Sequence, residues 1–128
     1  MRLLLDTCTF LWLVLDDPVI PAGVWELVRN PNNDLYLSVV ASWEMAIKYK
    51  AGKLALPEAP SVFVPEYRKK NNVLSLPLNE ESVLQVSKLP EFHSDPFDRM
   101  MVCQAIMHSL AIVTPDDMIR QYPVRTIW

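Results

Sequence analysis

Short apolar runs alternate with amphipathic segments along the chain, and this alternation limits the choice of fold more than any other feature. The clearest run, Leu3-Leu4-Leu5, is typical of a strand that is buried on both faces. The sequence predicts five strands, over Arg2–Leu5, Leu35–Val40, Val73–Leu78, Leu110–Val113 and Val124–Trp128. Because helical segments separate them, we expect a three-layer α/β fold, in which a parallel sheet of five strands carries helices on both faces.

Helix-start and helix-stop residues place the predicted helices between these strands. Ser42 is expected to cap the helix after the second strand, and Gly52 to end it in the left-handed conformation. Pro21 is expected at the first position of an earlier helix, and Asp95 is expected to cap a long helix that begins at Pro96. The predicted helices span 8–15, 21–29, 42–52, 60–70, 79–89, 96–108 and 116–122.

Composition predicts one domain and restricts the classes of function. The chain has 128 residues, of which 51% are hydrophobic and 21% charged, so we expect a single domain over residues 1–128 with its own core. A net charge of -3 disfavours nucleic-acid binding through overall charge; such binding would need a local basic rim or metal ions. Cys8 and Cys103 stand far apart and outside any metal-ligand spacing, which favours a reduced cytoplasm. No early apolar stretch is long enough for a signal or membrane segment, so we expect no membrane association.

Four acidic residues follow strands or begin helices in this arrangement: Asp6, Glu44, Asp98 and Asp116. Ligands bind open α/β sheets in the crevice at the carboxyl ends of the strands, where these acids could converge. Converging carboxylates repel one another unless a cation neutralises them, which favours a site for Mg²⁺ or Mn²⁺. Helix capping alone explains each acid taken singly, and the pattern at Asp95 is the most typical of a cap. Asp6 fits capping least well, because Thr7 offers another cap at that helix start.

Motifs for other kinds of catalysis are lacking. Gly23 and Gly52 are the only glycines, which excludes the glycine-rich loops that bind nucleotide phosphates. Ser42 lies outside a nucleophile elbow, and no phosphate-binding loop follows Cys8. Aspartate-based phosphotransfer would require a late lysine or an acid two residues after the nucleophile, and Cys8 stands at that place after Asp6.

The two histidines are assigned structural roles at this point. His93 is close enough to Asp95 in sequence to contact a substrate or a metal, but a loop-stabilising role is favoured. His108 is expected to interact with the carboxyl end of its helix.

The acids belong to four longer segments: Asp6–Trp12, Ser42–Lys48, His93–Arg99 and Val113–Asp116. Together and in this order, the segments resemble the motifs of PIN-domain proteins, and within that superfamily those of the VapC-type toxins of prokaryotic toxin–antitoxin pairs. The resemblance extends over essentially the whole chain. It implies the sheet order 3-2-1-4-5, which would bring Asp6 and Asp116 together.

The resemblance also implies a Mg²⁺-dependent endoribonuclease, with Mn²⁺ able to substitute. Its metal-binding and catalytic acids match Asp6, Glu44, Asp98 and Asp116, with Asp95 as a further candidate and Asp117 as an alternative to Asp116. We expect Asp6 and Asp98 to be direct ligands, and Glu44 and Asp116 to act through water. Members of the family often have His or Asn where this chain has Cys8, so we expect Cys8 to be a buried, non-catalytic side chain.

Contacts with RNA and with a partner protein are assigned to other residues. Candidates for phosphate contacts are Lys48, Lys50, Lys53 and Arg99. Trp12 and Trp25 are candidates for an exposed apolar groove, because a small chain cannot easily bury all its tryptophans; in the resembling family such a groove holds the antitoxin. We therefore expect an RNA substrate, an antitoxin partner, and a homodimer or hetero-oligomer. A catalytically inactive binding module and an aspartate-based phosphotransfer protein are the alternatives.

Overall fold

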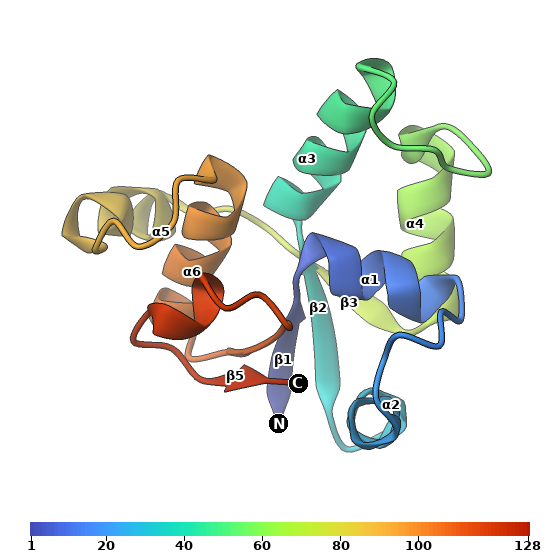
Figure 1. Ribbon diagram of the computed structural model, residues 1–128, viewed down its shortest axis with the longest axis horizontal. Coiled ribbons are helices and arrows are strands. Elements are labelled where there is room, and N and C mark those ends of the chain that lie inside the picture. The colour runs from blue at the N-terminus through green and yellow to red at the C-terminus, as the bar shows by residue number, and fades with distance from the viewer.

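A five-stranded parallel sheet forms the centre of the computed structural model, which describes residues 1–128 (Figure 1). The strands are β1 (Arg2–Leu5), β2 (Asp34–Ser38), β3 (Val73–Leu76), β4 (Ala111–Val113) and β5 (Thr126–Ile127). Their order is β3-β2-β1-β4-β5, and all four neighbouring pairs are parallel. The predicted fold class and sheet order are therefore confirmed.

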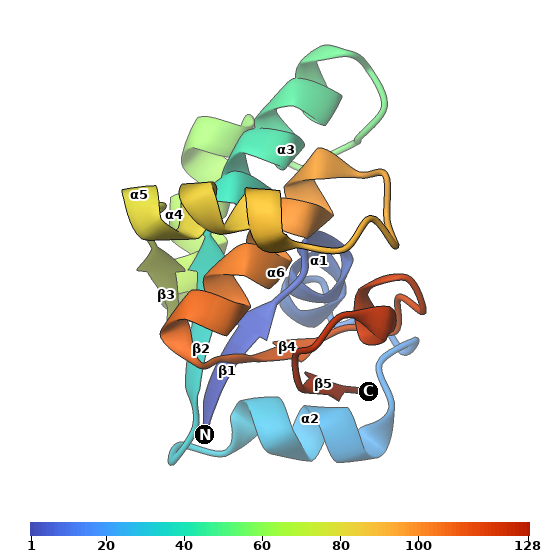
Figure 2. The ribbon, with the colours of Figure 1, turned by 90° about the vertical axis from the view of Figure 1, so that its left-hand side faces the viewer.

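Helices cover both faces of this sheet. They are α1 (Thr7–Val14), α2 (Ala22–Arg29), α3 (Val39–Lys50), α4 (Pro60–Lys70), α5 (Glu80–Leu84) and α6 (Pro96–His108), with 3₁₀ turns η1 (Gln85–Lys88) and η2 (Ile119–Gln121). Helices α5 and α6 lie in front of the sheet in Figure 2, α1 and α4 lie behind it, α2 runs below the amino ends of the strands, and α3 extends beyond their carboxyl ends. None of the helices combines the length and the apolar composition needed to cross a bilayer.

The central strand β1 is buried on both faces, as its uninterrupted apolar run predicts. Leu3, Leu4 and Leu5 are all 0% exposed. Leu3 pairs with Leu35 of β2 on one side and with Ala111 of β4 on the other. The end of β1 is thereby fixed in the middle of the sheet, and Asp6 follows directly.

Several predicted boundaries are wrong. Ser38, and not Ser42, caps α3: its hydroxyl accepts a hydrogen bond from the Val40 amide at 3.0 Å. The apolar run that continues through Val40 conceals this boundary in the sequence, because valines also favour strands. As a result Glu44 lies in the second turn of α3, not in the first. Gly52 does adopt the predicted left-handed conformation, with φ of 72°.

Two other helix predictions also differ from the structure at their boundaries. Pro21 is the residue before α2 and not its first helical residue. The helix predicted over 116–122 is reduced to the three residues of η2.

A buried polar contact fixes α6 relative to α3. Gln104, which is fully buried, accepts a hydrogen bond from the Ser38 hydroxyl at 2.5 Å and donates to the Pro77 carbonyl at 3.3 Å. Burying an amide is favourable only when its hydrogen bonds are made, so this arrangement specifies one packing of the two helices. Those helices carry Glu44 and Asp98.

Candidate active site

Acids from four separate segments line one pocket at the carboxyl end of the sheet. The cavity has a volume of about 220 Å³. Its carboxylates are those of Asp6 after β1, Glu44 on α3, Asp95 and Asp98 at the start of α6, and Asp116 after β4. Thr7, Cys8, Trp12, Lys48 and Pro115 complete its lining. The sheet order places the acids in this way because β1 and β4 are neighbours.

Asp6 serves as a helix cap and as part of the pocket. Its Oδ1 accepts from the Thr9 amide at 2.8 Å, and its Oδ2 accepts from the Thr114 hydroxyl at 2.5 Å. The expectation that Thr7 could take the capping role is therefore wrong. Burial raises the pKa of Asp6, while the hydrogen bonds from Thr114 and Thr9 act in the opposite direction.

Glu44 is buried in the wall of the pocket, with only 4% of its surface exposed. The Thr7 hydroxyl donates to its Oε1 at 2.6 Å, and the Lys48 ammonium, one helical turn further on, pairs with its Oε2. The hydrogen bond to Glu44 raises the pKa of Lys48. Because Glu44 lies in the second turn of α3, helix capping does not explain its position.

Asp95 and Asp98 share the first turn of α6 and differ in their contacts. Asp95 caps the helix, accepting from the amides of Phe97 at 2.8 Å and Asp98 at 3.1 Å, as predicted. The Asp98 carboxylate is turned into the pocket. Burial, followed by the negative charges of Asp95 and Glu44, raises the pKa of Asp98 to about 7.

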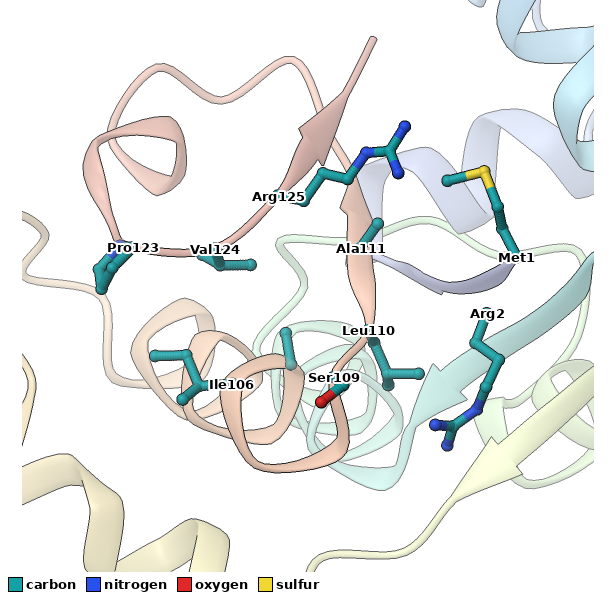
Figure 3. Close-up of a pocket in the computed structure, with 10 residues that line it drawn as sticks. Met1, Arg2, Ile106, Ser109, Leu110, Ala111, Pro123, Val124 and Arg125 are labelled. Atoms are coloured by element: carbon teal, nitrogen blue, oxygen red, sulfur yellow. The ribbon is translucent and has the colours of Figure 1, made fainter.

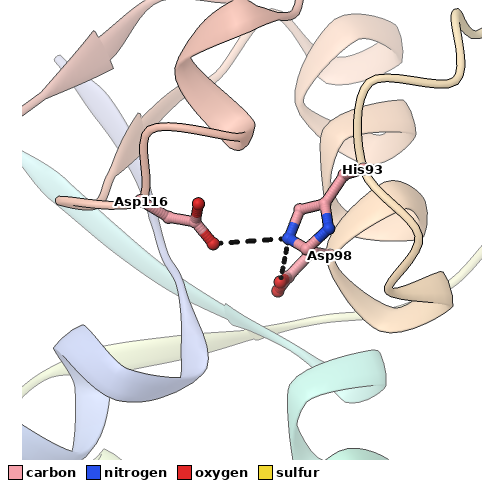
Figure 4. A group of neighbouring side chains, drawn as sticks. All are labelled: His93, Asp98 and Asp116. Carbon is pink, nitrogen blue, oxygen red and sulfur yellow. Dashed lines mark hydrogen bonds and ion pairs between the residues drawn. The ribbon is translucent and has the colours of Figure 1, made fainter.

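His93 lies between two of the acids (Figure 4). Its Nε2 is 3.0 Å from Oδ2 of Asp98 and 3.3 Å from Oδ2 of Asp116. One ligand atom from each of these three residues lies within 4.8 Å of the other two, which is the spacing of a metal-binding group. The sequence assigned His93 to loop stabilisation and did not identify its contacts with both acids.

Asp116 and not Asp117 takes part in this cluster. Asp117 is directed to solvent, with a side chain that is 92% exposed, and it pairs with Arg120 at 3.6 Å. Asp116 lines the pocket and also accepts from the Met118 amide at 2.8 Å.

The donor set of the pocket fits a hard divalent cation. Five carboxylates line it, the His93 imidazole lies beside two of them, and Lys48 is the one basic side chain in its lining. Burial, and after it this excess of negative charge, raises the pKa of Asp98. Carboxylate oxygens are the ligands that Mg²⁺ and Mn²⁺ prefer, and a bound ion would offset the repulsion.

Cys8 differs from its predicted environment. It is exposed, whereas burial was expected, and it lines the pocket beside the acids. Its position on the first turn of α1, between the core-facing Thr7 and Thr9, turns it away from the core. Partial removal of water by the surrounding pocket, followed by the charges of Asp6 and Glu44, raises the pKa of the thiol.

The four candidates for phosphate contacts are placed differently. Lys48 lines the pocket, and Lys50 and Lys53 are exposed at and beyond the end of α3. Arg99 is directed elsewhere: its Nη1 donates to the Pro90 carbonyl at 2.9 Å and to the Tyr122 hydroxyl at 3.2 Å.

The exposed tryptophan is Trp43, and the expectation of exposed rings at Trp12 and Trp25 is wrong. Trp12 is half-buried, with its ring centroid 5.7 Å from that of Trp128, and it lines the acidic pocket. Trp25 is half-buried too, and the guanidinium of Arg29 lies 4.1 Å from its ring centroid. Trp43 is 60% exposed.

A larger cavity, of about 440 Å³, lies at the amino end of the sheet (Figure 3). Arg2 and Arg125 line it together with apolar residues such as Ile106 and Leu110, and no carboxylate does. The five clustered acids therefore line the smaller pocket and not this one.

Solved structures resemble this fold over nearly the whole chain. A chain of VapBC2 from Rickettsia felis, bound to a DNA fragment from its promoter, has a TM-score of 0.74 at 15% identity, covering 99% of this chain and 98% of that one. DNA-bound VapBC from Salmonella typhimurium has a TM-score of 0.70 at 16% identity, with 99% and 97% covered. VapBC-1 from nontypeable Haemophilus influenzae has a TM-score of 0.67 at 19% identity, also with 99% and 97% covered.

Sequence comparison identifies the family. Ribonuclease VapC16 of Mycobacterium tuberculosis (strain ATCC 25618 / H37Rv) is 40% identical over 40 residues, which are 31% of this chain and 28% of that protein's length. The family model described as PIN domain matches residues 3–124, which include all five acids of the pocket. With its sheet order and the carboxylates gathered at the carboxyl end of that sheet, the chain belongs to the PIN domain family.

Proposed function

We propose that this protein is a Mg²⁺-dependent endoribonuclease of the VapC type, the toxin of a toxin–antitoxin pair. The observation that carries the proposal is the convergence of Asp6, Glu44, Asp98 and Asp116 in one pocket of a PIN domain. The similarity to a protein named Ribonuclease VapC16 supports the activity, and the likeness to chains of VapBC complexes supports the toxin–antitoxin assignment.

In this proposal Asp6 and Asp98 are the direct metal ligands, and Glu44 and Asp116 hold or orient the attacking water. Mg²⁺, or Mn²⁺ in its place, supplies Lewis-acid activation of that water and neutralises charge on the phosphoryl oxygens when it is bound. Thr114 and Thr7 keep the carboxylates of Asp6 and Glu44 in place through hydroxyl donors at 2.5 and 2.6 Å. Attack by water requires no 2′-hydroxyl and leaves a 5′-phosphate on the product.

The basic residues define how RNA would approach. Lys48, in the pocket, is suited to contact the phosphate at the cleavage site, and Lys50 and Lys53 are suited to contact phosphates further along the strand. Arg99 holds the loop that carries His93 and serves the substrate indirectly. Such an enzyme would act in the cytoplasm, where its RNA substrates are.

The proposed antitoxin would contact the side of the molecule that bears Trp12 and Trp25. Because Trp12 also lines the acidic pocket, a partner seated on this ring would at the same time restrict access to the acids. Binding and inhibition would then be one event. We propose a homodimer or a hetero-oligomer with the antitoxin.

One observation favours the second candidate, a binding module without catalysis. Asp6, Asp95 and Asp116 all accept hydrogen bonds from backbone amides, so local structure accounts for three of the five acids. Glu44 and Asp98 have no such role, and for this reason we prefer the nuclease.

Cleavage of RNA by the purified protein tests this choice. We expect cleavage with Mg²⁺ or Mn²⁺, none with EDTA, and none from Glu44→Gln under the same conditions. Cleavage that persists in EDTA would exclude the metal mechanism. An equal absence of cleavage in all conditions, on several RNAs, would favour the binding module.

A further inference from the structure

His93 is the one side chain that contacts the carboxylates of two pocket acids from different parts of the fold. Asp98 lies on α6, and Asp116 lies in the segment after β4, 18 residues later in the chain. The same ring atom, Nε2, faces Oδ2 of both (Figure 4). The His93 side chain is itself 15% exposed, so the contact is largely shielded from water.

The other ring nitrogen defines the tautomer. The Asp95 amide donates a hydrogen bond to Nδ1 at 3.2 Å, so Nδ1 carries a lone pair and no proton. A neutral imidazole of this kind has its proton on Nε2. The Nε2–H group therefore donates a hydrogen bond to Asp116 and lies 3.0 Å from Oδ2 of Asp98, and Nε2 has no lone pair to offer a metal.

The backbone of His93 is held as firmly as its ring. Its amide donates to the Tyr122 hydroxyl at 2.9 Å, and the same oxygen accepts from Arg99. Arg99 also binds the carbonyl of Pro90 at the start of this loop. The imidazole is thus fixed before any ligand binds.

The two acids depend on this donor to different degrees. The second oxygen of Asp116 accepts from the Met118 amide, so Asp116 keeps one contact without His93. For the Asp98 carboxylate, His93 is the only hydrogen-bonding or ion-pairing partner in the protein, and Oδ1 is free. Without the imidazole, nothing else in the protein would hold the Asp98 side chain in one orientation.

We propose that His93 is a positioning residue: its Nε2–H holds Asp98 and Asp116 so that the free oxygen of Asp98 is presented to a divalent cation. This inference rests on the proposed metal site and assigns His93 a place next to the ligands, not among them. Partners that orient metal ligands typically contribute 10–100-fold to metal affinity.

Mn²⁺ binding, followed by electron paramagnetic resonance and calorimetry on the full chain, tests the proposal. We expect His93→Ala to weaken Mn²⁺ binding about 10–100-fold, and His93→Gln, whose amide can donate from a similar position, to restore part of the loss. The matched control is His108→Ala, at the other end of α6 and outside the pocket, which should bind Mn²⁺ like the parent. Thermal melting in EDTA should show that all three variants are folded.

Pulsed electron paramagnetic resonance separates positioning from ligation. We expect no coupling between Mn²⁺ and a directly bound imidazole nitrogen; such a coupling, if lost in His93→Ala, would overturn the positioning role. Parent-like Mn²⁺ affinity in folded His93→Ala would overturn it as well, while leaving the proposed nuclease intact. Failure of the parent protein to bind millimolar Mn²⁺ would instead remove the metal site, and the proposed function with it.

Discussion

The two ends of the sheet carry opposite charge. The pocket at the carboxyl end is lined by five carboxylates, whereas the cavity at the amino end has twice the volume, about 440 against 220 Å³, and is lined by two arginines. Helix geometry explains much of this difference. Helices α1 and α6 begin at the carboxyl end, where Asp6 and Asp95 cap them, and α6 finishes at the amino end, where Arg2 donates to the His108 carbonyl at 2.9 Å.

The comparison teaches which charges need another explanation. Negative charge at helix starts and positive charge at helix ends are favourable in any parallel α/β fold. Glu44, buried in the second turn of α3, and Asp98, with a pKa raised to about 7, bind no backbone amide through their side chains. Asp98 costs stability in the absence of a cation, whereas Glu44 is paired with Thr7 and Lys48. Helix capping explains neither acid, and in our proposal both mark the carboxyl end as the functional one.

The largest expected effect comes from removing the charge of Asp98. Asp98→Asn should reduce RNA cleavage by well over 100-fold, because losing a ligand should exceed the 10–100-fold typical of a residue that only orients one. Its stability in EDTA should stay level or rise, since the repulsion with Asp95 and Glu44 is relieved. Gel-based cleavage assays and urea unfolding measure both effects.

Arg125→Ala, at the amino end, is the matched control and should leave cleavage unchanged. If Asp98→Asn cuts RNA at the parent rate, the carboxyl end of the sheet is no more functional than the amino end.

The next effect is a dependence of stability on pH in the metal-free protein. The folded pKa of Asp98, about 7, lies above its ordinary value of 3.8, so between these values the folded state binds the extra proton. The free energy of unfolding should therefore fall as the pH rises from 5 to 7, by on the order of 2 kcal/mol at the ~1.4 kcal/mol per unit that linkage gives. Urea unfolding in EDTA across this range measures it.

The difference between the parent and Asp98→Asn isolates this contribution from the other titrating groups. The variant should show a flatter profile, and added Mg²⁺ should restore parent stability most strongly near pH 7 and above. Parallel profiles for the two proteins would contradict the assignment of the proton to Asp98.

A smaller effect separates capping from charge at Asp95. Asp95→Ala removes the cap of α6 and should lower stability by about 0.5–2 kcal/mol. Asp95→Asn keeps a capping oxygen and should be close to the parent in stability. If Asp95→Asn nevertheless loses cleavage as severely as Asp98→Asn, Asp95 belongs with the metal ligands and its charge is not explained by capping.

The sequence predicts the convergence of the acids because parallel strands bring their carboxyl ends to one edge. Uninterrupted apolar runs such as Leu3–Leu5 indicate such strands, and four segments with PIN-like motifs supply the order that places Asp6 near Asp116.

Features that depend on distant contacts are not predictable in this way. The loop that carries His93 is held by a hydrogen bond from the His93 amide to the Tyr122 hydroxyl, 29 residues away. A contact between residues so far apart leaves no hydrophobic periodicity in the sequence. Likewise, the sequence predicts strand at Val39 and Val40. The helix begins there because the Ser38 hydroxyl, which also donates to the buried Gln104, accepts a hydrogen bond from the Val40 amide.

The smallest expected effect is at Cys8, the one neutral thiol among the pocket acids. Cys8→Ser should keep metal-dependent cleavage within about twofold, because a thiol is a poor ligand for Mg²⁺ and the raised pKa of Cys8 keeps it protonated. Since the side chain is exposed, stability should change by less than about 0.5 kcal/mol. Cys8→Asp is a second test at this position. It places a further carboxylate beside Asp6 and Glu44, so the variant should be less stable than the parent in EDTA, and Mg²⁺ should restore its stability. A loss of cleavage in Cys8→Ser as large as that in Asp98→Asn would show that the thiol contributes to the chemistry at this end of the sheet.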